Sequence, residues 1–194
     1  MKLGFESASN YGGNHEEGGQ AITAVLDFWT NAGPDKWFAK DDAFDVEFRS
    51  RFLELHLAAA SRELDSWADD PRGALALLLL LDQFPRNAFR GTGHMYATDS
   101  LAKMFATTAV TRGFDMDVEA SLRLFFYLPF SHSEDLADQE RAVELHKRIN
   151  YTKYAIEHLD VVKRFGRFPH RNLMLGRETT VAEKAFLDEG GFAG

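Results

Sequence analysis

The sequence has no cysteine and little proline. Without a thiol, the chain can form no disulfide, zinc–thiolate site or thiol nucleophile. Only 5 prolines occur among 194 residues, which favours helices over a turn-rich β fold. A secretory signal is missing as well, because the first twenty residues contain no apolar stretch. We therefore expect a cytoplasmic protein.

Long apolar runs are also missing. The longest, Ala74–Leu81, has eight residues, whereas about 20 are needed to cross a bilayer. A net charge of −8 opposes binding to nucleic acid or anionic lipid. The phosphate-binding glycine loop, the Gly-x-Ser-x-Gly elbow and the His-Glu-x-x-His motif are all absent from the sequence. The sequence thus predicts no membrane span, no nucleic-acid partner, no cofactor and no metal.

The composition is that of an ordinary globular protein, with 45% apolar and 27% charged residues. Apolar residues recur at steps of three and four along most of the chain. This pattern predicts an all-α fold of about seven to eight helices with short connections, packed as antiparallel pairs. Residues 1–20 contain five glycines and are expected to form a flexible N-terminal arm. Residues 21–194 are expected to form a single helical domain.

Two helices have the clearest signals. A cap at Asp41 or Asp42 opens a helix in which two adjacent apolar rows predict a wide buried face. The first row is Phe44, Phe48, Phe52, Leu55 and Ala59, and the second is Leu53, Leu57, Ala60, Leu64 and Trp67. Asp70-Pro71 opens a central helix that is apolar nearly all round. Pro85 is expected to end or kink this helix near Phe84.

Other boundaries follow from caps and helix breakers. Helices are expected to start at Ala21, Asp99 and Asp117, and to end at Gly113, Pro129 and Gly166. Capping-box spacing occurs in Ser131–Glu134 and again in Thr180–Glu183. Each box predicts that a helix begins just after its first residue.

Three polar segments carry more chemistry than ordinary loops. They are Asp82–Asn87, Ser131–Asp135 and Arg164–Arg177. The first follows a wholly apolar helix, so its side chains lie where the core reaches the surface. The candidate pocket residues are Asp82, Gln83, Arg86, Asn87, His132, Glu134, Arg167, His170, Arg171 and Asn172. If these residues form a site, the three segments must meet in the folded chain.

The first and third segments resemble each other. Each contains Phe-Pro followed within three residues by Arg-Asn, in Phe84–Asn87 and in Phe168–Asn172. The similarity predicts two similar helix-end structures, and its origin is either an ancestral duplication or chance.

Two interpretations of these polar residues stay open. Arginine forks suit carboxylates and phosphates, so Arg167 and Arg171 could hold an anionic ligand with help from His170 and Asn172. Alternatively, the arginines pair with the chain's surplus carboxylates and tie helix ends together. His132 and Glu134, with His170, could serve acid–base chemistry or bind a metal, or they could simply belong to a helix cap. The spacing of His132 and Glu134 is not diagnostic, because residues i and i+2 do not share a helix face.

Four long strings in the chain are specific enough to suggest a family. They are Asp27-Phe28-Trp29, Leu79–Thr92, Tyr127–Glu134 and Phe165–Asn172. They resemble a bacterial family known as the domain of unknown function numbered nine-two-four, over about residues 21 to 188. The resemblance implies an all-α fold similar to tetratricopeptide superhelices. It implies no established activity and no catalytic residue, and the glycine-rich start departs from the family pattern.

Two classes of function are compatible with these features. One is a helical binding or adaptor domain, whose groove would hold a peptide or protein partner. The alternative is a small-molecule enzyme or an anion-binding protein that uses a His/Glu/Arg cluster. A purely structural role of the motifs is a third possibility, and the oligomeric state is left open.

Overall fold

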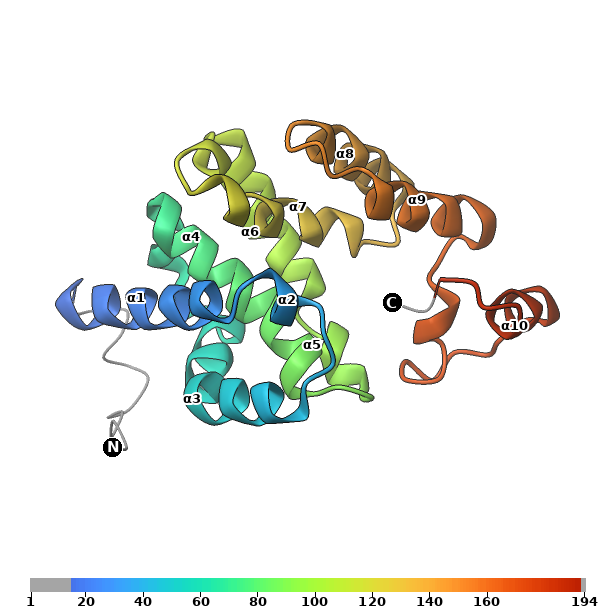
Figure 1. The fold of residues 1–194 in the computed structure, drawn as a ribbon, viewed down its shortest axis with the longest axis horizontal. Helices are drawn as coiled ribbons and strands as arrows, with labels where there is room; N and C mark the ends of the chain where they lie inside the picture. Colours follow the sequence, from blue (N-terminus) through green and yellow to red (C-terminus); the bar gives the residue numbers. More distant parts are fainter. Residues whose placement is uncertain (1–14, 193–194) are drawn as a thin grey trace.

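The computed structural model describes residues 15–192, and this part of the chain is helical without a strand (Figure 1). Eight of its α-helices have eight or more residues, which confirms the predicted all-α fold. The finer prediction of a tetratricopeptide-like superhelix is not confirmed by this arrangement. None of the described helices is long and apolar enough to cross a membrane.

The first layer consists of α1 (His15–Ala32), the short α2 (Pro34–Trp37) and α3 (Asp42–Ala60). Helix α1 begins six residues before the predicted start at Ala21, so the end of the expected arm is helical, while residues 1–14 lie outside the described residues. Trp37 lies in α2, and its indole Nε1 donates to the carbonyl of Trp29 at 2.7 Å.

Helix α3 confirms one apolar row and contradicts the other. Asp41 caps it, and the predicted row from Phe44 to Ala59 is buried. The second row does not form a helix face, because α3 ends at Ala60 and Leu57 is exposed. Leu64 and Trp67 are buried instead in the turn and 3-10 helix η2 (Asp65–Asp69) that follow.

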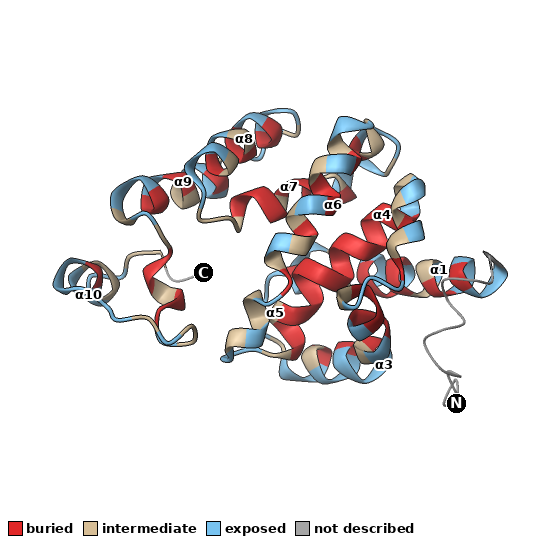
Figure 2. Cartoon of the chain, turned by 180° about the vertical axis from the view of Figure 1, so that it is seen from behind, coloured by how far each residue is buried: buried red, intermediate tan, exposed pale blue. Residues whose placement is uncertain are grey.

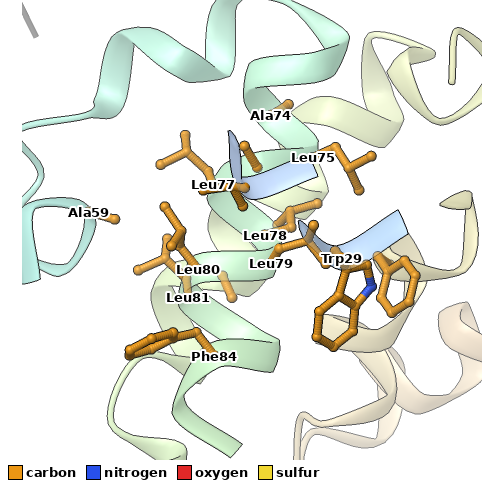
Figure 3. Close-up of a cluster of buried hydrophobic side chains, with 14 of the residues drawn as sticks. Trp29, Ala59, Ala74, Leu75, Leu77, Leu78, Leu79, Leu80, Leu81 and Phe84 are labelled. Atoms are coloured by element: carbon orange, nitrogen blue, oxygen red, sulfur yellow. The ribbon is translucent and has the colours of Figure 1, made fainter. Parts of the chain in front are cut away.

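Helix α4 (Pro71–Leu78) is central and contacts α1, α6 and α7. As predicted, Asp70 caps it and Pro71 occupies its first turn. The chain continues into a π-helical turn, η3 (Leu79–Gln83), and then into α5 (Phe84–Ala88). Leucines point outward all round this segment (Figure 3), and Figure 2 shows it buried along its length. The predicted interruption near Phe84 thus takes the form of the π-helical turn, and Pro85 itself lies in the first turn of α5, where proline is tolerated.

Helices α6 (Asp99–Thr111) and α7 (Leu124–Ser131) cover the other side of α4, with η4 (Gly93–Tyr96), η5 (Phe114–Met116) and η6 (Ala120–Leu122) as 3-10 connections. Asp99 starts α6 as expected. The predictions that Asp117 starts the next helix and Pro129 ends it are wrong. The chain passes through η6 before α7 begins, and Pro129 lies inside α7. Burial of the phenylalanines on either side of Pro129 holds the helix despite the missing hydrogen bond.

Helices α8 (Leu136–Lys147) and α9 (Lys153–Phe165) pack side by side next to α7 (Figure 1). The predicted Ser131–Glu134 capping box does not form, because Ser131 still belongs to α7. Asp135 caps α8 instead and accepts hydrogen bonds from the amides of Ala137 and Asp138. Gly166 closes α9 in the left-handed conformation, at φ 71°, as predicted.

The chain ends in η7 (Pro169–Arg171) and α10 (Val181–Asp188). The Thr180–Glu183 capping box of α10 is present as predicted. A small apolar cluster of Val161, Val162 and Phe168 supports this region, apart from the main core. Figure 2 shows α10 mostly exposed or half-buried. The three polar segments therefore lie between the main core and a smaller C-terminal cluster.

Candidate functional site

The three polar segments of the sequence meet in the structure. His132, just after α7, contacts Asp82 of the π-helical turn η3. Arg171 of η7 donates to the carbonyl oxygen of His132 at 3.0 Å. The amide of Phe168 donates to Glu134 at 2.9 Å. Side chains from η3, η7 and the loop between α7 and α8 thus surround one buried polar cluster.

The π-helical turn positions the first members of this cluster. Three successive carbonyls in it accept hydrogen bonds from side chains: Leu80 from His56, Leu81 from Thr98 and Asp82 from Arg86. These bonds occur where the α-helical pattern is interrupted by the π turn and by Pro85, which has no N–H. Turns of this kind are frequent at functional sites. The turn fixes both Asp82 and Arg86 against α6.

Asp82 and His132 form a buried pair. The Asp82 carboxylate is 1% exposed, and its Oδ1 lies 2.7 Å from Nδ1 of His132. Burial alone would raise the pKa of Asp82, but Arg86 and His132 outweigh it and lower this pKa to about 2. Burial, reinforced by Arg86, lowers the pKa of His132 to about 4. At neutral pH a neutral imidazole therefore donates from Nδ1 to a carboxylate, and its lone pair is on Nε2.

Asp99 joins the two arginines of the cluster. Arg86 binds both Asp99 oxygens, at 2.8 and 3.0 Å, and its Nη1 also lies 3.2 Å from Asp82. Arg171 reaches Asp99 from the other side at 3.4 Å. Asp99 opens α6 as predicted, and a helix-opening acid gives no sign of distant arginine partners. Asp99 is thus a member of the cluster that sequence reasoning missed.

Arg171 is held between two aromatic rings and retains unused donors. Its guanidinium lies 4.6 Å from the ring centroid of Tyr96 and 4.4 Å from that of Phe168. Only its Nη1 makes hydrogen bonds to residues in the described part of the chain. Its buried Nε has no partner. Tyr96 is a second residue that sequence reasoning missed, because its role depends on an arginine 75 positions later in the chain.

Glu134 links the loop after α7 to the C-terminal region. It accepts from Arg177 at 2.8 Å and from the amide of Phe168. Burial alone would raise its pKa, but these two hydrogen bonds lower it. Glu134 therefore serves as an anion that fixes the position of η7, and it is not part of a capping box.

Several predicted site residues point elsewhere. Asn87, with Arg90, binds Asp45 in the first turn of α3. Arg167 and Asn172 bind Glu183 in the first turn of α10, at 2.6 and 3.3 Å. Gln83 stays beside the cluster and donates to Asp82.

The two Phe-Pro motifs thus have the same design. Each places its arginine, Arg86 or Arg171, on Asp99. Each directs its asparagine to an acid in the first turn of a neighbouring helix. The side-chain partners are thus alike, but the backbones differ, since Phe84 is helical and Phe168 is extended. The shared partners support the interpretation that the arginines tie helix ends together, with Arg171 retaining donors of its own.

His170 lies at the edge of the cluster, among aromatic rings. Burial, then the charge of Arg171, lowers its pKa to about 4, and its buried Nδ1 has no hydrogen-bond partner. His158 of α9 lies 6.1 Å from His132, measured between ring centroids. Residues 15–192 contain no group of three or more side chains arranged to hold a metal ion.

Comparisons with known proteins agree on a family. A solved structure of a protein of unknown function from Agrobacterium tumefaciens is 57% identical, with a TM-score of 0.87, and the match covers 89% of this chain and 99% of that one. No curated protein matches the chain. The family described as bacterial protein of unknown function (DUF924) matches residues 25–191. The chain therefore belongs to this bacterial family, as its polar strings suggested.

Proposed function

We propose that this protein is a cytoplasmic enzyme that acts on a small carboxylate- or phosphate-bearing molecule by acid–base catalysis. The observation that carries the proposal is the buried Asp82–His132 pair, at 2.7 Å, beside an arginine with unused donors. His132 is the base, Asp82 orients it and Arg171 binds the anionic group.

The pairing of Asp82 with His132 suits a general base. A carboxylate that accepts from Nδ1 fixes the tautomer and leaves Nε2 free to take a proton from a ligand hydroxyl or from water. In the described residues, Nε2 of His132 has no hydrogen-bond partner among the side chains or carbonyls around it. The proton taken by Nε2 creates an imidazolium that the Asp82 carboxylate stabilises, and a later step returns the proton to the product.

Arg171 supplies the anion selectivity. Arg86 is committed to Asp82 and Asp99 through several contacts, so it holds the site together. Arg171 has its Nε free, and an Nε–Nη2 edge matches the two oxygens of a carboxylate or phosphate. The hydrogen bond from Arg171 to the His132 carbonyl keeps such a ligand close to the base.

A bound anion also improves the base. In the free protein, burial and Arg86 hold the pKa of His132 at about 4, which makes the imidazole a weak base. A negative ligand beside it favours the imidazolium and moves this pKa upward, toward the range where a general base is most effective. Binding of the substrate therefore makes His132 a stronger base.

Burial favours a small ligand over a peptide. Asp82 is 1% exposed and Arg171 is 6% exposed, so both lie beneath the surface that a protein partner would touch. An adaptor groove would present such groups on an open concave face. The cluster therefore fits the enzyme alternative better than the adaptor alternative.

The test is a screen of small carboxylates, inorganic phosphate and phosphate monoesters by thermal shift, followed by NMR detection of turnover. Wild type is compared with His132→Gln, Asp82→Asn and Arg171→Lys. His146→Gln is the matched control, since His146 is a buried histidine bonded to the Ala142 carbonyl in α8.

We expect at least one compound to be converted by wild type. His132→Gln should lower kcat by about 10²–10⁴-fold, as the loss of a general base does. Arg171→Lys should raise KM, and the control should leave both constants unchanged. If the compounds stabilise all variants equally and none is converted, the proposal is wrong.

A further inference from the structure

Phe192 lies against a trio of rings at the edge of the proposed site. Its ring centroid is 4.4 Å from that of His158, 5.5 Å from His170 and 6.2 Å from Phe168. Within the trio, Phe168 contacts both histidine rings at 5.6 Å. Phe168 is fully buried, whereas Phe192 is half-buried. The three rings thus form the walls and floor of an aromatic subsite that Phe192 fills.

The segment that carries Phe192 is held mainly by that ring. After α10, Gly190 adopts a left-handed φ of 79°, and the amide of Gly191 donates to the carbonyl of Phe186. No backbone hydrogen bond of Phe192 occurs in the described part of the chain. On its outer side, Phe192 lines a surface hollow of about 430 Å³ together with Val161 and Phe186. Phe192 therefore separates this hollow from the histidines.

Phe192 is a poor chemical match for the place it fills. The buried Nδ1 of His170 has no hydrogen-bond partner, and a phenyl ring offers none. Burial lowers the pKa of both His158 and His170 to about 4, so at neutral pH their rings are uncharged and suited to stacking. A ligand ring that carries a hydrogen-bonding group could satisfy this nitrogen when it displaces Phe192.

The subsite is continuous with the anion-binding arginine. The ring of Phe168 contacts the histidines and also lies 4.4 Å from the Arg171 guanidinium. A ligand ring placed over Phe168 would therefore bring an attached carboxylate to Arg171. On the basis of the proposed function, we propose that the substrate is an aromatic carboxylate or a similar ring-bearing anion. Its ring displaces Phe192 from the subsite of His158, Phe168 and His170.

Three carboxylates test the contribution of the ligand ring separately from that of its charge. Benzoate has an aromatic ring, cyclohexanecarboxylate has a saturated ring and acetate has none. Their affinities are measured by NMR titration of the full-length wild type, Phe192→Ala and Phe192→Trp. Phe114→Ala is the control, because Phe114 is also half-buried and lies in η5 beside Arg112. Arg171→Lys reports on the anion site independently.

We expect Phe192→Ala to bind benzoate at least about tenfold more tightly than wild type, with acetate affinity unchanged. Phe192→Trp should weaken benzoate binding, since a larger ring fills the subsite. Bound benzoate should shift the imidazole signals of His158 and His170, and the Phe114 control should behave as wild type.

Two results would overturn the subsite. One is a benzoate affinity that Phe192→Ala and Phe192→Trp leave unchanged. The other is an equal gain for acetate or cyclohexanecarboxylate. If the proposed enzyme site itself is wrong, the result is different: acetate does not bind, or Arg171→Lys leaves the acetate affinity unchanged. If the acetate affinity depends on Arg171 while the benzoate affinity is the same in wild type and both Phe192 variants, only the aromatic subsite is wrong.

Discussion

Burial of His158 should make the stability of the fold depend on pH. Burial, reinforced by the charge of Arg171, lowers the pKa of this imidazole from 6.5 to about 4. Below pH 6.5 the unfolded chain binds a proton at this position, and the folded chain does not. The contribution of the neutral imidazole is therefore fully present above pH 6.5 and is lost as the pH falls toward 4. The difference corresponds to about 3 kcal/mol, at about 1.4 kcal/mol per pH unit.

The assay is urea unfolding at several pH values between 7 and 4.5. His132 and His170 also have their pKa lowered to about 4, so the slopes of the three histidines add. His158→Gln removes one titrating group. It should reduce the dependence of the unfolding free energy on pH by about 1.4 kcal/mol per pH unit.

Leu159→Ala provides the matched control. Leu159 is the buried neighbour of His158 in α9, so its truncation lowers stability by removing apolar contacts without removing a titrating group. Its curve should run below that of wild type with the same slope. A His158→Gln slope equal to that of wild type, or a slope changed as much by Leu159→Ala, would refute the assignment.

Two further variants test the supports of the site. Thr98→Val should lower the unfolding free energy, measured by urea unfolding at pH 7, by about 1–3 kcal/mol, because the buried Leu81 carbonyl loses its hydroxyl donor. Thr98→Ser keeps the hydroxyl and should retain most of the stability. Gly73→Ala should lower the melting temperature sharply, since a Cβ there would lie 2.2 Å from the Trp67 carbonyl oxygen. An unchanged melting temperature would contradict this expectation, because it would show that the turn before α4 can move to make room for the Cβ.

Several helix caps could be predicted from the sequence, because their chemistry spans only a few residues. Asp41 and Asp70 cap their helices, and Thr180 with Glu183 forms the predicted box. The Ser131–Glu134 box had equally good spacing, but Ser131 remains in α7 and Glu134 binds Arg177, a residue 43 positions away. Spacing alone cannot reveal such competition from a distant part of the chain.

The sequence predicted that the three polar segments must meet if they form a site. It did not predict how their side chains are arranged. The apolar helix that precedes Asp82 was expected to end where the core reaches the surface, but Asp82 is buried, and Arg86 and His132 contact it within the core. Asp99 and Tyr96 gave no signal, because each gains its role through Arg171 on a distant segment. Partners of this kind depend on tertiary packing, which apolar periodicity does not encode.

The π-helical turn in the central helix amounts to one residue inserted into an α-helix. An α-helix turns by about 100° per residue, so everything after Gln83 is rotated by about that angle relative to the leucines before it. Without the extra residue, Asn87 would take the present direction of Arg86, and Arg86 would take that of Pro85, so neither would face its present acid. Deleting one leucine from η3 would keep the core apolar and yet turn the Phe-Pro-Arg-Asn motif away from Asp99. The orientation of the whole polar cluster thus depends on a single residue of length in an otherwise featureless run of leucine.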